Sequence, residues 1–80
     1  MIKLELFYNS DVDNETENLA QKLKEKFADK VDIFLRDTTK DQIPESYGII
    51  NPPVAVLDGR QKIKIEGHEE FEKLIMKAIF

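Results

Sequence analysis

The densest group of reactive side chains is an acidic cluster between Asp11 and Glu17, where four carboxylates alternate with uncharged residues. Carboxylates spaced in this way are typical of calcium-binding loops, but an EF-hand loop requires glycine at its sixth position and glutamate at its twelfth. Counted from Asp11, those positions hold Thr16 and Lys22. We therefore predict no metal site here, and we expect the cluster to complement the positive N-terminal end of a helix.

His68 is the only histidine of the chain. A single imidazole cannot form a two-histidine metal site, and a general base needs a nucleophile within hydrogen-bond reach. His68 follows Gly67 and precedes two glutamates, which is a pattern typical of the start of a helix. We therefore expect a capping or surface role for His68, and we predict no catalytic residue and no cofactor.

Cysteine is absent from the 80 residues, which excludes disulfides, thiol catalysis and thiolate-bound metals. The 12 basic and 16 acidic side chains give a net charge of −4, and this argues against nucleic acid because phosphate contacts require clustered Lys and Arg. No apolar run reaches the ~20 residues of a membrane span, and the sequence starts without the pattern of a secretion signal. We expect a single cytoplasmic domain over residues 1–80 that binds neither a membrane nor nucleic acid.

The first half of the chain predicts a strand, a helix and a second strand. Ile2–Tyr8 alternates two sets of residues along its length, as a strand does. Residues 13–28 carry apolar side chains three and four positions apart, which is the stripe of an amphipathic helix that Asp13 or Asn14 can cap. Residues 31–36 alternate again. A strand–helix–strand order with so long a helix favours a parallel pair of strands.

The second half predicts a short helix, a β-hairpin and a final helix. Gln42–Tyr47 is consistent with one or two helical turns, and Gly48 suits the position that follows a helix. Val54–Leu57 is an apolar strand, and the Asp58-Gly59 dipeptide favours a tight turn in which both residues take positive φ. A return strand follows, and the last helix opens at Gly67-His68. The expected order is β-α-β-α-β-β-α in one α/β unit.

Two sets of apolar residues are expected to pack on opposite faces of the sheet. Phe7, Phe34 and Tyr47 should bury against the short second helix, or otherwise form a patch for self-association or for a partner. Met76 and Phe80 lie off the main stripe of the last helix. The first and last helices should share the other face through Leu19, Leu23, Phe27, Phe71, Leu74, Ile75 and Ala78.

The segment Tyr47–Gly59 carries the most specific pattern of the chain. It reads YGIINPPVAVLDG, in which a Tyr-Gly-Ile precedes the prolines, an apolar run and a polar-Gly turn. With Gly67 closing the last strand, this pattern resembles the thioredoxin-like fold, and it is most similar to small glutaredoxin-sized prokaryotic members. The resemblance implies a four-stranded mixed sheet with helices on both faces, in which the first two strands are parallel, the third is antiparallel to the first and the fourth lies at an edge. It also implies a cis peptide bond between Pro52 and Pro53.

The first loop departs from the family pattern. Members of the family carry C-x-x-C roughly where this chain places Val12 and Glu15, and neither of these residues can attack a disulfide. The resemblance therefore brings no redox activity, and we predict no thiol-disulfide oxidoreductase activity. Pro52 precedes the expected cis-proline and has no N–H with which to pair a substrate backbone, so any remaining groove is blunted. Its candidate residues are Tyr8, Ser10, Asp11, Val12, Glu15, Asn51, Pro52 and Pro53.

The sequence leaves three functions open. The leading hypothesis is a redox-inactive thioredoxin-like domain that binds a protein partner of unknown identity, as a monomer or a weak homodimer. The second is an accessory protein of a thiol-redox system whose thiols come from a partner. The third is a degenerate glutathione-binding domain, because Tyr8 or Ser10 stands near the position where glutathione transferases activate glutathione. The acidic cluster should repel that anion, so any ligand of the first loop is expected to be cationic or neutral.

Overall fold

The computed structural model describes residues 1–79, and these residues form four strands, two α-helices and one 3-10 helix. The elements follow one another in the expected order, with the 3-10 helix in place of the predicted second α-helix. Their bounds are β1 (Ile2–Tyr8), α1 (Thr16–Phe27), β2 (Val31–Asp37), η1 (Glu45–Tyr47), β3 (Val54–Leu57), β4 (Gln61–Lys64) and α2 (His68–Ile79).

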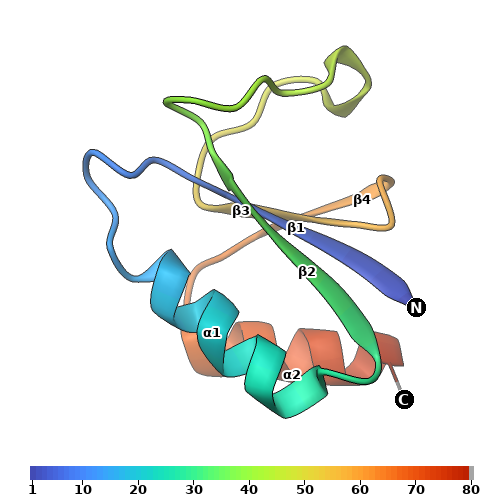
Figure 1. Ribbon diagram of the computed structural model, residues 1–80. Coiled ribbons are helices and arrows are strands. Elements are labelled where there is room, and N and C mark those ends of the chain that lie inside the picture. The colour runs from blue at the N-terminus through green and yellow to red at the C-terminus, as the bar shows by residue number, and fades with distance from the viewer. Residues whose placement is uncertain (80) are drawn as a thin grey trace.

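The four strands form one mixed sheet in the order β2-β1-β3-β4 (Figure 1). β1 pairs with β2 in parallel, with Leu6 beside Leu35, and with β3 in antiparallel, with Leu6 beside Ala55. β4 is antiparallel to β3 and forms one edge of the sheet. The predicted strand pairing is confirmed. Because β1 and β3 run in opposite directions, the end of β1 and the start of β3 lie side by side.

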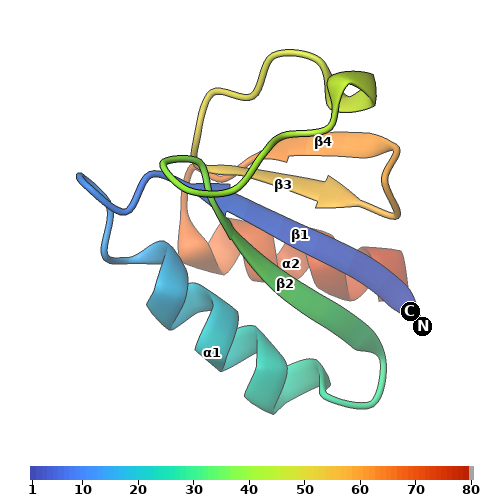
Figure 2. The same cartoon turned by 45° about the horizontal axis from the view of Figure 1, so that its top comes forward.

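Both α-helices lie on the same face of the sheet (Figures 1 and 2). α1 buries Leu19 and Leu23, and α2 buries Phe71 and Ile75. Removing a side chain of this kind from water stabilises a fold by roughly 1.5–3 kcal/mol. These residues join the inward side chains of the strands in a single core. Its buried members are Leu4, Leu6, Leu19, Ala20, Leu23, Phe27, Val31, Ala55, Ile65, Phe71 and Ile75.

The expected packing of α2 is wrong at Leu74 and Ala78. The side chain of Leu74 is 47% exposed and Ala78 is also exposed, whereas Phe71 and Ile75 are each 1% exposed. Residues four apart lie along one line of a helix, and α2 turns only the line through Phe71 and Ile75 toward the sheet. The apolar stripe in the sequence is therefore wider than the surface that the sheet and α1 offer to this helix.

The second helix is shorter than the sequence predicts. In place of one or two turns over Gln42–Tyr47, the structure has a single 3-10 turn at Glu45–Tyr47. Pro44 precedes this turn, and a proline both lacks an N–H and holds the residue before it in an extended conformation. Gly48, with a φ of 68°, ends the turn. Within residues 1–79 the second face of the sheet thus carries an irregular segment with one 3-10 turn, and no α-helix lies there.

The aromatic residues of the second face only partly follow the expectation. Phe7 is 1% exposed, and its ring meets the ring of Tyr47 edge to face, with centroids 6.0 Å apart. Phe34 is 38% exposed instead, because it lies on β2, which is an edge strand. Met76 on α2 is exposed as well, and Phe80 lies outside the described residues.

The turn between β3 and β4 has the predicted conformation. Asp58 and Gly59 have φ values of 51° and 69°, and the Arg60 N–H donates to the Leu57 carbonyl at 3.0 Å. The Asp58 carboxylate also accepts a hydrogen bond from the Lys3 N–H at 2.9 Å. The hairpin is therefore anchored to β1, which fixes β3 and β4 relative to the centre of the sheet.

Candidate functional site

Asp13 holds the N-terminus of α1. Its Oδ1 accepts hydrogen bonds from the backbone N–H groups of Glu15 (2.8 Å) and Thr16 (3.1 Å), and its Oδ2 accepts one from the Thr16 hydroxyl (2.6 Å). The N-cap position is Glu15, whose side chain makes no capping hydrogen bond, so the prediction of Asp13 or Asn14 as the cap is wrong in position, although Asp13 accepts from the N–H groups at the helix entrance. Burial raises the pKa of Asp13, but the hydrogen bonds from Thr16 and Glu15 outweigh burial and leave the pKa below its ordinary value. Asp13 is therefore a negative charge committed to the helix start.

Asp37, at the end of β2, fixes the loop that follows β1. Its Oδ1 accepts hydrogen bonds from the Ser10 N–H (3.3 Å), the Thr39 N–H (3.0 Å) and the Thr39 hydroxyl (2.8 Å). Hydrogen bonding by Ser10 is the largest of the causes that hold the pKa of Asp37 well below its usual range. Tyr8 is buried, and burial with neighbouring carboxylates raises its pKa. Of the predicted groove residues, Tyr8 is thus buried at the end of β1, and Ser10 is held by Asp37.

The peptide bond between Pro52 and Pro53 is cis, as predicted. The Pro53 carbonyl accepts a hydrogen bond from the Ile65 N–H at 3.1 Å, which ties the start of β3 to the segment after β4. The Lys64 ammonium donates to the carbonyls of Asn51 (2.9 Å) and Pro52 (3.3 Å). The residue before the cis-proline therefore has no N–H to offer a ligand, and its carbonyl already accepts from a lysine.

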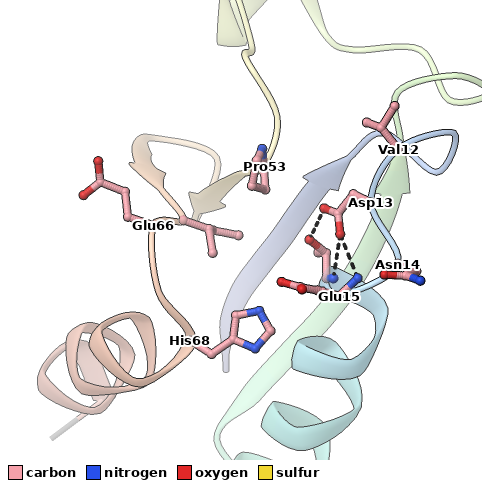
Figure 3. A pocket seen from close by; sticks show the side chains of 9 residues that line it. Val12, Asp13, Asn14, Glu15, Pro53, Glu66 and His68 are labelled. Atoms are coloured by element: carbon pink, nitrogen blue, oxygen red, sulfur yellow. Dashed lines mark hydrogen bonds between the residues drawn. The ribbon is translucent and has the colours of Figure 1, made fainter.

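A pocket of about 440 Å³ opens between the start of α1, Pro53 and the turn from β4 to α2 (Figure 3). In Figure 3, Val12 and Pro53 stand on one side of it and His68 on the other. Its surface combines apolar side chains with carboxylates and one imidazole. The lining residues are Val12, Asp13, Asn14, Glu15, Thr16, Pro53, Ile65, Glu66 and His68.

The structure brings only part of the predicted groove to this pocket. Val12, Glu15 and Pro53 line it, so three of the predicted groove residues, including the cis-proline, share one surface. Asp11 and Asn51 are exposed elsewhere on the loops. The predicted groove residues that do not line the pocket are Tyr8, Ser10, Asp11, Asn51 and Pro52.

The turn from β4 to α2 supplies pocket residues that are absent from the predicted groove. Their position could have been predicted from the hairpin of β3 and β4. With a tight turn at Asp58-Gly59, the residues just after β4 must lie beside the residue just before β3, which is Pro53. The pocket residues absent from the predicted groove are Asp13, Asn14, Thr16, Ile65, Glu66 and His68.

Two glutamates give the pocket a negative charge that the protein leaves unpaired. Glu15 and Glu66 are exposed, and neither forms an ion pair within residues 1–79. The charge of Asp13 adds to theirs. Carboxylates outnumber the one imidazole of this pocket, and a concave site with an excess of one charge sign attracts ligands of the opposite sign. Across the described range, no group of three or more His, Asp or Glu residues is arranged to hold a metal ion.

A search with models of known protein families and a search of curated proteins both return no match for this chain. Neither α-helix within the described residues has the length and apolar character needed to cross a membrane. What this protein does must therefore be argued from the chemistry of its own surface.

Proposed function

We propose that this chain is a redox-inactive thioredoxin-like domain that binds a segment of a protein partner in the pocket beside Pro53. The observation that carries this proposal is the pocket itself, which is formed by the start of α1, the cis-proline and the β4–α2 turn. In the family, the loop before this helix carries the reactive thiols. Here the chain has no cysteine, so the site that remains is suited to binding.

The order and pairing of the strands support the thioredoxin-like assignment. A parallel pair joined by α1, a cis-proline at the entrance to an antiparallel third strand and a terminal helix on the same face as α1 all agree with the resemblance. The second face departs from it, because η1 replaces an α-helix there. Fold alone does not define a function, and the residues that line the pocket determine which ligand it suits.

The ligand that suits this pocket is an extended segment with a basic side chain. Val12, Pro53 and Ile65 offer apolar surface to the aliphatic stem of a lysine or arginine, whose charged end can stay near water. Glu15 offers an unpaired carboxylate to that charge, and Glu66, whose side chain points away from Pro53 in Figure 3, adds negative charge at the rim of the pocket. Recognition falls to the side chain because the backbone of Pro52 is a poor pairing partner. The same carboxylates disfavour glutathione, which is an anion.

An NMR titration tests the proposal. The ¹⁵N-labelled protein is titrated with a short peptide in which one arginine is flanked by apolar residues, with the same peptide carrying glutamate instead, and with millimolar glutathione. The arginine peptide should produce saturable shifts in the amides of residues 12–16 and 65–68. The glutamate peptide and glutathione should leave those amides, and the amides of residues 50–54, unchanged.

The glutamates of the pocket provide the matched variants. Replacing Glu15 and Glu66 together by glutamine should weaken the binding that these shifts report by at least about tenfold, whereas Glu25→Gln, at an exposed site of α1 outside the pocket, should leave it unchanged. Equal binding of the arginine and glutamate peptides would overturn the proposal. Saturable shifts with glutathione at residues 9–17 and 50–54 would instead assign the site to a glutathione-binding domain.

A further inference from the structure

The two edges of the sheet differ in length and in side chains. β4 has four residues, and two of them are lysines, a composition that discourages pairing with a further strand. β2 has seven residues and carries Ile33, Phe34 and Leu35 at its centre. Phe34 is 38% exposed. The β2 edge is therefore long and apolar enough to accept another strand.

The hydrogen bonds at the two ends of β2 show which residues face outward. The Ile2 N–H donates to the Lys30 carbonyl at 3.3 Å, and the Thr38 N–H donates to the Tyr8 carbonyl at 2.8 Å. In a parallel pair, alternate residues direct both backbone groups toward the neighbouring strand. Even-numbered residues of β2 thus face β1, and odd-numbered residues direct their N–H and C=O groups away from the sheet.

The outward groups at the end of β2 are already bonded. The Asp37 N–H donates to the Asp41 carboxylate at 2.8 Å, and the Asp37 carbonyl accepts from the Asp41 N–H at 2.7 Å. The outward groups of Ile33 and Leu35 have no partner within residues 1–79. Two N–H and two C=O groups at the centre of the edge are therefore open to a second chain.

We propose that β2 pairs with β2 of a second copy of this chain, antiparallel about a two-fold axis at Phe34. In this register Ile33 lies opposite Leu35 of the second copy, and each such pair exchanges two N–H···O=C bonds. The two-fold axis generates the same pair again, so the outward groups of both residues are satisfied in both copies. The two four-stranded sheets then continue as one.

The charges of β2 select this partner and this register. Asp32 lies opposite Arg36 of the second copy, and opposite charges across an antiparallel pair are favourable. Asp32 is exposed and forms no ion pair within residues 1–79. Arg36 donates to Glu5 through Nε at 3.2 Å, which leaves the other N–H groups of its guanidinium for a partner. Shifting the register by one pair of residues places Asp32 opposite Phe34 and loses both charge pairs.

Hydrogen exchange combined with sedimentation equilibrium tests the proposal. Small interfaces associate weakly, so protein from about 10 μM to about 1 mM is compared. In dilute solution the amides of Asp32, Phe34 and Arg36 should exchange slowly and those of Ile33 and Leu35 quickly. At high concentration the mass should approach that of a dimer, and the amides of Ile33 and Leu35 should become protected.

Charge variants identify the surface. Asp32→Arg places like charges opposite each other at two symmetric positions and should weaken the dimer about tenfold. Glu69→Arg makes the same charge change on exposed α2 and should leave the dimerisation constant unchanged. A monomer at every concentration would overturn the proposal, as would a dimer that protects neither Ile33 nor Leu35 and instead shifts signals at Leu74 and Met76 of α2.

Discussion

Carboxylates are held in opposite ways in two regions of the molecule. On the second face of the sheet, Glu5 is 3% exposed and accepts hydrogen bonds from the Tyr47 hydroxyl and from Arg36 Nε at 3.2 Å. At the pocket, Glu15 and Glu66 are exposed and form no ion pair within residues 1–79. A buried charge persists only when it is paired, whereas an exposed unpaired charge is stable in water and stays free for a ligand. The first region therefore serves the fold, and we propose that the second serves recognition.

Removing a side chain from the apolar core should lower the free energy of unfolding more than any change at the two carboxylate regions. Leu23 is 0% exposed, so Leu23→Ala should lower the free energy of unfolding by about 2–5 kcal/mol through the cavity it leaves. Leu74, at 47% exposed, is the matched control, and Leu74→Ala should cost less than about 1 kcal/mol. Urea denaturation of both variants measures the difference. Equal losses would mean that α2 turns a different line toward the sheet.

The Glu5 cluster should come next in size. Glu5→Gln keeps the volume but loses the charge that Arg36 and Tyr47 contact, and it should lower the free energy of unfolding by about 1–3 kcal/mol. Tyr47→Phe keeps the ring against Phe7 and removes only the hydroxyl, and it should lower the free energy of unfolding by about 1 kcal/mol. The hydrogen bond to Glu5, together with burial, raises the pKa of Tyr47, so the hydroxyl is a proton donor at neutral pH. If Glu5→Gln left the urea midpoint unchanged, the buried carboxylate would contribute no more to stability than the exposed carboxylates of the pocket, which would contradict this comparison.

Acid should weaken the fold through its partnered carboxylates. Hydrogen bonding by Ser10 and Thr39 lowers the pKa of Asp37 in the folded protein, so the unfolded chain takes up that proton first. The stabilisation is complete above the unfolded pKa of about 3.9 and is lost as the pH falls toward the lower folded value. Urea midpoints at about pH 7 and about pH 3 measure this loss.

Two aspartate variants isolate the source of the acid effect. Asp37→Asn should lower stability at neutral pH and flatten its fall in acid, because the titrating group is gone. Asp29→Asn, at an exposed position after α1, is the matched control and should keep the acid profile of the wild type. An unchanged acid profile in Asp37→Asn would show that other groups carry the effect.

The smallest stability effect is expected at the pocket. Glu15 and Glu66 are exposed and unpaired within residues 1–79. Each replacement by glutamine should change the free energy of unfolding by less than about 0.5 kcal/mol. Relief of repulsion among neighbouring carboxylates can even make the change favourable. A loss as large as that of Glu5→Gln in the same urea experiment would mean that these side chains serve the fold too.

The sheet and its turns were readable because they follow local rules. Alternation over Ile2–Tyr8 and the Asp58-Gly59 turn fixed the strands, and the antiparallel return of β3 followed from the family resemblance. The same alternation placed Glu5 on the other face of the strand from Leu4 and Leu6, but it did not indicate that Glu5 is buried. That burial depends on Tyr47, which is distant in sequence and reaches Glu5 only through the segment between β2 and β3. A long-range polar contact leaves no periodic signal.

The pocket was predicted in part for a similar reason. Val12, Glu15 and Pro53 follow from the resemblance, which implies where members of that family carry their thiols and their cis-proline. Glu66 and His68 enter through the geometry of the hairpin, and their place depends on how β4 turns into α2. Leu74 was predicted to be buried and is exposed. A clear apolar stripe on a helix does not indicate how much of that stripe the rest of the fold can cover.

The most direct test of the account is the affinity of the arginine peptide for three forms of the protein, measured by isothermal titration calorimetry. The wild type should bind saturably, and binding should weaken with added salt. The Glu15→Gln, Glu66→Gln double variant should fold normally and bind at least about tenfold more weakly, because the negative charge that attracts the basic side chain is removed. Glu5→Gln should be less stable and yet bind the peptide with wild-type affinity at a temperature where it is folded. Unchanged binding by the double variant, or loss of binding in folded Glu5→Gln, would contradict the assignment of recognition to the pocket beside Pro53.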